Sequence, residues 1–341
     1  MKVAVIGAGP AGMTAGYELS KKIKQVEVFE ASSSVGGMSK TIELWNQKVD
    51  VGPHRFFSSD NRINELWLEV VGRDYEMVDR LTRIYYNKKF FHYPIKGMDA
   101  LKNLGLIEAA RCMTHYGLEK ISPTKDISSF EGWVTNRFGK RLYQIFFKTY
   151  TEKLWGIPCN ELDADFAAQR IKKFSLGEAV KTALFGNKGE HKTLVDQFAY
   201  PHGGTGMVYE RMSAFVKTQG GEVNLSTPVH RIITKNNKIK ALEFEDGTVK
   251  DYDHVVSSMP LTLMVQRLPE VPDKVKEAAA SLKFRNTIIV YLNINQKDLF
   301  PDNWLYIHSN KMKMGRLTNF RNWVPQLFGN ENSTICALEY W

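Results

Sequence analysis

The sequence predicts an α/β protein built around a Rossmann-type dinucleotide-binding domain, and three observations near the N terminus support that prediction. The apolar run Val3–Ile6 has the pattern of a strand that enters a glycine-rich turn. The turn opens a helix that we expect from about Pro10 to Lys22, and a second apolar run, Val26–Phe29, follows. Strand, turn, helix and strand form one βαβ unit, which implies a parallel sheet.

The composition is that of a globular protein, and its charge favours a small anionic substrate. The 341 residues suffice for two domains, and 43% of them are hydrophobic and 24% charged. The net charge of +9 is dispersed, which favours a few arginines in a cleft over a nucleic-acid surface. No stretch is apolar enough for membrane insertion, and three widely separated cysteines predict neither a metal site nor a disulfide framework. Because the N terminus carries no cleavable signal, we expect a cytoplasmic protein.

The rest of the chain predicts mixed helices and antiparallel sheet. Residues 60–130 have a mainly helical pattern around a hairpin at 84–93. Residues 130–154 form a long amphipathic helix or helix pair, and 161–185 continue the helical character. A glycine-rich turn at 201–206 precedes a helix, a β-meander and a strand that returns to the nucleotide-binding sheet. The later expected elements are a helix at about 272–282 and strands at 286–294, 303–308, 314–320 and 333–340.

The glycines of the first turn indicate a dinucleotide site. Gly7 permits the tight turn, Gly9 lets a pyrophosphate approach the backbone, and Gly12 lets helix and strand pack closely. The phosphates then meet the N–H groups around Pro10 and Ala11 and the positive end of the helix dipole.

A second group of residues favours FAD over NAD. Glu30 ends the second strand, where an acid accepts hydrogen bonds from a ribose diol. The pair Gly36–Gly37 lets another loop pass close to the cofactor, a feature that plain NAD dehydrogenases do not usually carry. Gly52 and the proline after it set an unusual backbone path with His54 at its tip, and a lone histidine there is either structural or close to the chemistry.

Together these observations predict a glutathione-reductase-like FAD-binding domain and a discontinuous substrate domain. We expect residues 1–57 and 200–262 to form the FAD-binding domain. We expect residues 58–199 and 263–341 to form the mixed helical and antiparallel-sheet substrate domain.

At this point the chain resembles the UDP-galactopyranose mutases, a family within the flavin amine oxidase and protoporphyrinogen oxidase superfamily. The resemblance runs through nearly all of the sequence and includes the glycine turn, Gly36–Gly37 and the Gly52-Pro53-His54 loop. It also includes Phe91-His92-Tyr93-Pro94 and the segment from Tyr200 to Gly206. The block from Trp133 to Gly156 and the two arginines named below are more specific to the mutases. Lys172-Lys173-Phe174 departs from the bacterial pattern, so the match is to a eukaryotic-type or divergent branch.

The resemblance implies a nucleotide diphosphate sugar as substrate and two arginines that clamp its pyrophosphate. Arg170 and Arg316 stand at the expected positions, and guanidinium forks suit phosphate oxygens. Tyr93, Trp304 and Tyr306 resemble the aromatic residues that frame the sugar and the uridine. We expect His54 to shape the flavin environment. The expected cofactor contacts are Gly7, Gly9, Pro10, Ala11, Gly12, Glu30, Gly36, Gly37, Met38, Gly52, His54 and Val229.

By the same resemblance, reduced FAD attacks the anomeric carbon through N5, and the sugar interconverts between pyranose and furanose. The reduced form is needed for this activity, and NAD(P)H is a candidate external reductant. A further C-terminal flavin-contact segment of the family is not expected within the 341 residues. Two alternatives stay open: an FAD-dependent oxidoreductase of the amine oxidase or protoporphyrinogen oxidase type, and a non-catalytic flavin-binding module. The oligomeric state is not predicted.

Replacing Arg170 by alanine removes one of the two expected phosphate clamps. We expect Arg170→Ala to weaken UDP-sugar binding and turnover together, because the guanidinium neutralises charge in both the bound and the reacting state. Titration calorimetry with UDP and steady-state kinetics would measure the two effects. Wild-type values for both would remove Arg170 from the site.

Overall fold

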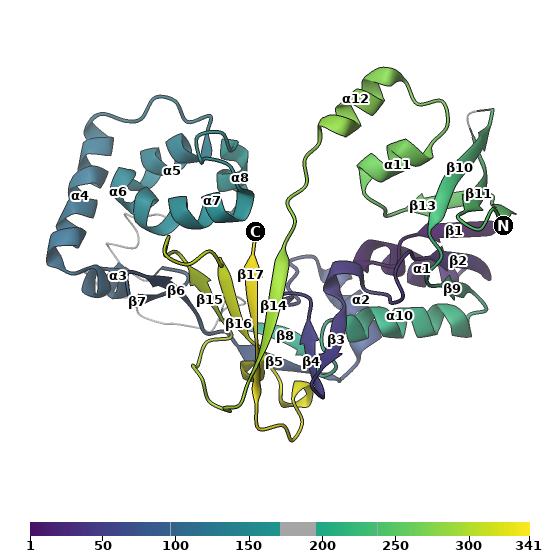
Figure 1. The fold of residues 1–341 in the computed structure, drawn as a ribbon, viewed down its shortest axis with the longest axis horizontal. Coiled ribbons are helices and arrows are strands. Elements are labelled where there is room, and N and C mark those ends of the chain that lie inside the picture. Colours follow the sequence, from purple (N-terminus) through teal and green to yellow (C-terminus); the bar gives the residue numbers. More distant parts are fainter. Residues whose placement is uncertain (96, 171–195, 237) are drawn as a thin grey trace. The chain divides into compact units, whose positions relative to one another are not determined.

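The computed structural model describes residues 1–95, 97–170, 196–236 and 238–341. Within these ranges the chain forms two compact units (Figure 1). The first consists of Met1–Val78, Phe198–Phe284 and Val324–Glu331, and the second of Asp79–Gln197, Arg285–Trp323 and Asn332–Trp341. Residues 263–284, which we expected in the substrate domain, lie in the first unit.

The first unit contains the predicted βαβ unit. Strand β1 (Lys2–Ile6), helix α1 (Pro10–Ser20) and strand β2 (Gln25–Phe29) follow one another as expected. β13 (His254–Ser257) and β9 (Glu222–Asn224) complete a parallel sheet in the order β13-β1-β2-β9. The Rossmann-type α/β fold class is therefore confirmed.

Both faces of this sheet are covered, which explains why β1 is apolar at four successive positions, from Val3 to Ile6. Val5 and Val28 face a core that includes Met13 of α1 and residues of α2 (Asn61–Val71) and α10 (Gly206–Thr218). Ile6 and Phe29 face the opposite way, toward a core that they share with a second sheet. That sheet is the predicted β-meander of β10 (Val229–Lys235), β11 (Lys238–Phe244) and β12 (Val249–Asp251).

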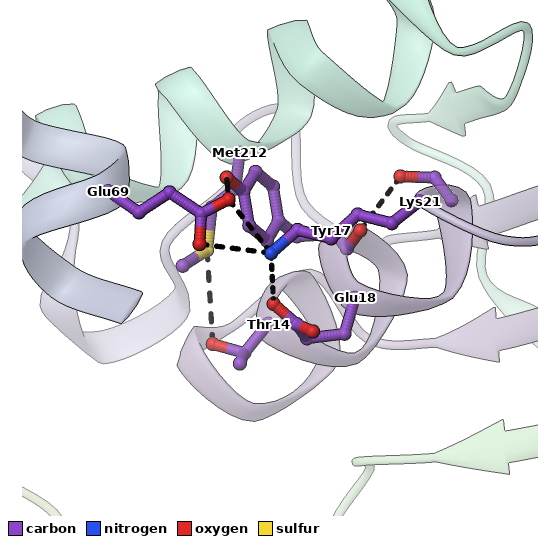
Figure 2. A network of polar contacts seen from close by, with 7 residues as sticks. Thr14, Tyr17, Glu18, Lys21, Glu69 and Met212 are labelled. Carbon is purple, nitrogen blue, oxygen red and sulfur yellow. Dashed lines mark hydrogen bonds and ion pairs between the residues drawn. The ribbon is translucent and has the colours of Figure 1, made fainter. Parts of the chain in front are cut away.

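A polar network ties α1 to α2 at the surface of the first unit (Figure 2). The Tyr17 hydroxyl donates to Glu69 at 2.8 Å, and the Lys21 ammonium bridges Glu69 and Glu18. Burial, and after it the bond to Glu69, raises the pKa of Tyr17 to about 12. Tyr17 therefore stays a hydrogen-bond donor at physiological pH.

The second unit carries a six-stranded sheet in the order β14-β17-β16-β15-β6-β7. β6 (Thr82–Tyr86) and β7 (Lys89–His92) are the predicted hairpin, and all pairs are antiparallel except β15 with β6. The predicted C-terminal strands are also confirmed. They are β14 (Ile288–Ile294), β15 (Trp304–Ile307), β16 (Arg316–Asn319) and β17 (Thr334–Tyr340).

The helices of the second unit are shorter than the sequence pattern suggests. The helix expected over 130–154 is broken at Gly139, whose φ of +82° ends one helix, and again by a π-helical turn. Of the helix expected over 161–185, only the part before residue 171 lies within the described residues. The helices are α3 (Gly97–Leu104), α4 (Leu106–Ile121), α5 (Phe130–Phe138), α6 (Lys140–Tyr143), η2 (Gln144–Lys148), α7 (Thr149–Trp155) and α8 (Ala164–Arg170).

Several short elements were not predicted. They are the hairpin of β3 (Thr41–Leu44) and β4 (Gln47–Asp50), the pair β5 (Tyr75–Asp79) and β8 (Gln197–Pro201), α11 (Leu261–Arg267), and the 3-10 turns η1 (Gly37–Ser39), η3 (Phe320–Asn322) and η4 (Pro325–Leu327). The helix expected at 272–282 is α12 (Asp273–Ser281). In the described part of the chain, no helix has the length and apolar character to cross a bilayer, and no cluster of potential metal ligands occurs.

Alanine substitutions at two glycines should change the stability of the protein in opposite directions. A Cβ on Gly12 would lie 1.8 Å from the carbonyl oxygen of Gly7, whereas one on Gly117, inside α4, meets no described atom within 4 Å. We expect Gly12→Ala to cost at least about 2 kcal/mol of unfolding free energy. Gly117→Ala should add about 0.5–1 kcal/mol, because glycine weakens a helix interior. Differential scanning calorimetry would test both; a neutral Gly12→Ala would contradict the packing described here.

Candidate functional site

The first glycine loop is held against the end of β2 by backbone contacts. The Gly7 N–H donates to the carbonyl of Phe29 at 2.7 Å, and the Ala8 N–H donates to the Glu30 carboxylate, also at 2.7 Å. Gly9 is the N-cap of α1, and no described side chain caps that end of the helix. The half-buried Glu30 therefore lies beside an uncapped helix N terminus, as the dinucleotide prediction requires.

The second glycine loop packs directly on the first. The Gly36 N–H donates to the carbonyl of Ala8 at 2.8 Å. A Cβ on Gly37 would lie 3.0 Å from the Cα of Gly9, and Gly36 and Gly37 both have positive φ, at +98° and +52°. Two backbones without side chains thus line one surface at the helix N terminus. This surface fits a pyrophosphate, because a side chain on either loop would fill the space beside the N–H groups.

A hairpin connects this loop to the segment that carries His54. The expected residues Gly36, Gly37 and Met38 precede β3, and Gly52 and His54 follow β4. Because Thr41 pairs with Asp50 at the open end of the hairpin, both segments leave it side by side. The Val51 N–H donates to the carbonyl of Lys40 at 3.1 Å, which holds them together. Met38 is 76% exposed.

A fully buried carboxylate, Asp50, anchors this region. It accepts hydrogen bonds from the hydroxyls of Thr41, Tyr200 and Thr205, at 2.6–2.7 Å, and from the Thr205 N–H at 3.1 Å. Burial raises the pKa of Asp50 in spite of these four donors. The glycine-rich turn before α10 is packed against the hairpin, since a Cβ on Gly206 would lie 2.4 Å from the Thr41 nitrogen.

His54 lies in a loop fixed from both sides. Gly52 has a φ of +86°, which explains the unusual backbone path predicted for this loop. The His54 Nε2 lies 3.0 Å from the carbonyl of Val51. The Thr205 hydroxyl has a single proton, which faces both Asp50, at 2.7 Å, and the carbonyl oxygen of His54, at 2.9 Å. Asp50, through Thr205, therefore helps to position the His54 backbone.

The remaining expected cofactor contacts lie at the same end of the sheet. Pro10 begins α1, and Ala11 is exposed in its first turn. The Thr227 N–H donates to the carbonyl of Glu30 at 2.8 Å, which brings the start of β10 beside the ribose acid. Val229, the first residue of β10, is buried against Phe29 in the core between the two sheets. The structure thus gathers the predicted cofactor residues within one unit.

In the second unit Arg316 forms an ion pair with a buried acid. Its guanidinium donates through two nitrogens to the Glu339 carboxylate, the Nε bond measuring 2.6 Å. Glu339 is 2% exposed and the Arg316 side chain 23%. Burial lowers the pKa of Arg316, but the pair with Glu339 outweighs it and leaves the pKa above its usual value. Arg316 therefore keeps its charge, and its orientation is fixed by Glu339.

Aromatic rings surround this ion pair. Tyr306 lies opposite Arg316 in the β15–β16 register. The ring of Tyr306 makes edge contacts with those of Tyr93, at 5.1 Å between centroids, and Tyr150, at 5.3 Å. Tyr150 also contacts Trp341, over which the Arg316 guanidinium lies at 5.7 Å. We call Tyr93, Tyr150, Tyr306, Arg316, Glu339 and Trp341 the aromatic–arginine cluster.

One of the predicted substrate residues, Trp304, lies outside this cluster. Trp304 is 5% exposed, two residues before Tyr306, and its ring lies 5.8 Å from that of Trp323. Arg170 is the last residue of α8, and its side chain lies outside the described residues. Their roles, like those of the other site residues, stay predictions.

The sequence reasoning did not single out Asp50, Tyr150 or Glu339. Tyr150 lies in the block from Trp133 to Gly156 that carried the resemblance, and its place in the helical pattern suggested only packing. Glu339 reaches Arg316 because β17 pairs with β16, and this register is a contact through space. Asp50 ends a polar strand with no apolar alternation to reveal it.

The glycine loops, Glu30 and the adjoining hairpin have the arrangement expected of a dinucleotide-binding protein of the flavin class. The chain matches the family described as flavin containing amine oxidoreductase over residues 10–321, and it belongs to that family. The cofactor of this family is a flavin, which agrees with the prediction of FAD.

The relatives of the chain include both mutases and oxidoreductases. A probable UDP-galactopyranose mutase of Klebsiella pneumoniae is 27% identical over 185 residues, covering 51% of this chain and 46% of that protein. A neurosporene-forming phytoene desaturase of Rhodobacter capsulatus is 26% identical over 284 residues, covering 75% and 52%. The chain thus spans about half the length of these two relatives. A crystal structure of reduced UDP-galactopyranose mutase matches with a TM-score of 0.85 at 20% identity, covering 99% of this chain and 74% of that one, which shows a shared fold.

Asp50 offers a test of how the His54 loop is held. An asparagine would place a donor where a hydroxyl or N–H now donates, so we expect Asp50→Asn to cost about 1–3 kcal/mol of stability and to weaken FAD binding. Because burial raises the pKa of Asp50, its stabilising contribution falls as the pH rises through that pKa, and the variant should lose this dependence. Denaturant titrations at several pH values and flavin fluorescence would measure both effects.

The exposed Asp251, paired only with Lys240 among the described residues, provides the matched control. Asp251→Asn should leave both measurements unchanged. An Asp50→Asn protein that matches it would show that Asp50 does not anchor the loop.

Proposed function

We propose that this chain belongs to a flavoenzyme that acts on a nucleotide diphosphate sugar in the manner of a UDP-galactopyranose mutase. The observation that carries the proposal is the aromatic–arginine cluster, in which a charged pair lies among tyrosine and tryptophan rings. The sequence similarity to a probable UDP-galactopyranose mutase supports it.

The charge of the cluster favours a polar substrate over a hydrocarbon. Removing a guanidinium and a carboxylate from water is costly unless both are paired and hydrogen-bonded. Seating a carotenoid-like chain on Arg316 would add that cost without any compensating bond. A phosphate or a sugar hydroxyl instead accepts hydrogen bonds from the part of the guanidinium that Glu339 does not occupy.

Each residue of the cluster then has a task that requires neither a strong acid nor a strong base. Arg316 neutralises the charge of the departing diphosphate, and Glu339 keeps its fork in one orientation. The rings of Tyr93 and Tyr306 provide apolar faces against which a sugar or a uracil ring packs. When bound, reduced FAD supplies a nucleophilic N5 for the anomeric carbon, and the His54 loop borders that cofactor.

A net oxidoreductase is the second candidate, and one observation favours it. The phytoene desaturase matches 75% of this chain, more than the 51% matched by the mutase. A desaturase or oxidase consumes an oxidant at every turnover, whereas a mutase returns its flavin unchanged. The two candidates therefore differ in the electron balance of the reaction.

One experiment separates these functions. The purified protein with FAD is reduced and incubated with UDP-galactopyranose or UDP-galactofuranose, and the products are separated by chromatography while oxygen uptake is recorded. Interconversion of the sugars with no more oxygen uptake than the reduced protein shows without sugar supports the proposal. A flavin-loaded protein that converts neither sugar but reduces a dye with another substrate would favour the oxidoreductase. No turnover of any kind would favour a non-catalytic flavin-binding module.

Replacement of Arg316 by lysine tests its role directly. Lysine keeps the charge but loses the planar fork, so we expect Arg316→Lys to raise the Kd for UDP at least about tenfold, or about 1.4 kcal/mol. Titration calorimetry on the FAD-loaded protein would measure this affinity.

Arg83 provides a matched control. It forms a similar two-bond pair with the buried Asp302 on the same sheet, at 2.8 and 2.6 Å. It follows Thr82 and precedes Ile84, the partner of Tyr306, so it faces away from the aromatic–arginine cluster. Arg83→Lys should leave UDP affinity unchanged. Equal effects of the two variants would assign them to stability and remove Arg316 from the site.

A further inference from the structure

A half-buried lysine joins α7 to the turn between β15 and β16. The Lys153 ammonium donates to the carbonyl oxygens of Ile307, at 3.0 Å, Ser309, at 2.6 Å, and Met314, at 3.2 Å. These three carbonyls lie on both sides of the turn, at the end of β15 and just before β16. One cation therefore closes the turn and ties it to the helix.

The environment of Lys153 is unusual for a cation because it lacks an acid. No salt bridge joins Lys153 to a carboxylate in the part of the chain that the structure describes. The neighbouring Glu152 turns toward Lys148, at 3.9 Å, and Arg285 donates to the Lys153 carbonyl at 3.3 Å. Carbonyl oxygens replace water only in part, and burial lowers the pKa of Lys153 to about 8.

The turn that Lys153 holds carries the central residues of the aromatic–arginine cluster. Tyr306 immediately precedes Ile307, the first residue whose carbonyl accepts from Lys153. Arg316 lies two residues after Met314, the last of them. Tyr150 lies three residues before Lys153 on the same face of the helix, and its ring stacks on His308 within the turn at 5.1 Å. Helix α7 thus contacts the β15–β16 turn in two ways: through the Tyr150 ring on His308 and through the Lys153 ammonium on the turn carbonyls.

We infer that Lys153 is a positioning residue of the nucleotide-sugar site, whose ammonium orients Tyr306 and Arg316 by tying the β15–β16 turn to α7. This inference rests on the proposed function. It adds a regulation by pH, because the turn has its full set of hydrogen bonds only while Lys153 is protonated.

The loss of one proton is enough to loosen this contact. An ammonium has three N–H donors for three carbonyls, whereas a neutral amine has two donors and turns a lone pair toward the third oxygen. A carbonyl then lacks its partner in a largely buried place, which is unfavourable. The turn is expected to become mobile when that happens, and the orientation of Arg316 is lost with it.

The other ionisable groups that face Lys153 do not change charge near neutral pH. Burial lowers the pKa of His308 to about 3, so that ring stays neutral. Burial also raises the pKa of Tyr150 well above its usual value. The pair with Glu339 keeps the pKa of Arg316 above its usual value in spite of burial, so Arg316 stays charged. A change in substrate affinity near pH 8 therefore has Lys153 as its source.

The test is the pH profile of UDP affinity in the FAD-loaded protein, measured by titration calorimetry from about pH 6.5 to about pH 9. In the wild type we expect the affinity to fall about tenfold as the pH rises through 8. Lys153→Met should bind weakly at every pH, with no inflection. Lys153→Arg, which keeps its charge throughout this range, should bind with a flat profile and regain most of the affinity.

Lys148→Met is the matched control, since Lys148 is exposed and lies one turn earlier on the same helical segment. It should retain the wild-type affinity and inflection. A Lys153→Met profile equal to that of the wild type would overturn the inference, and so would a wild type without an inflection. If Lys153→Met does not fold, Lys153→Arg decides, because an inflection that persists in it cannot come from Lys153.

The failure of this inference differs from the failure of the proposed function. A flavin-loaded wild type that binds neither UDP nor UDP-galactopyranose at any pH overturns the proposed function. If the wild type binds UDP and the Lys153 variants have the same pH profile of UDP affinity, only the role of Lys153 is overturned.

Discussion

The structure of the cofactor unit depends on one steric constraint, the contact of backbone with backbone where β1 meets α1. At Gly12 there is no space for a side chain, because the carbonyl of Gly7 occupies it, and Ser258 fills what remains above Gly7. This contact fixes the direction of α1 and leaves its N terminus open. The second glycine loop repeats the arrangement, with Gly37 against Gly9, so the expected FAD site has bare backbone on two sides.

Buried acids are satisfied in two ways in this protein. In the first unit, Asp50 is surrounded by hydroxyl and N–H donors from three segments, while the second buried acid of that unit, Glu27, pairs with Lys2 and Lys250. The second unit buries acids opposite guanidinium groups, in the pairs of Arg83 with Asp302 and Arg316 with Glu339. The hydrogen bonds to Asp50 fix backbone loops, whereas Glu339 fixes the orientation of a guanidinium that can bind an anion. Each suits the ligand proposed for its unit.

The sequence predicted the elements with strong apolar patterns and missed those held by polar contacts. The βαβ unit, the meander and the C-terminal strands follow from runs of apolar residues, and all were found. The β3–β4 hairpin was missed because it turns at Trp45 and Asn46, which have positive φ without being glycine, and because its buried residues include Gln47. The break at Gly139 was readable, since glycine often ends a helix. Arg316 could be located along the chain, but its pairing with Glu339 depends on a strand register that no local pattern encodes.

The parallel contact between β15 and β6 also has a consequence for the order in which the chain assembles. Thr82 pairs with Trp304, so the β6–β7 hairpin must wait for more than half of the polypeptide before its neighbour in the sheet exists. In the cofactor unit, β1 pairs with β13 across a similar distance in sequence. During synthesis both sheets therefore keep open strand edges until late, and closing such long loops is slow. In that interval the unpaired edges are exposed to pairing with another copy of the chain.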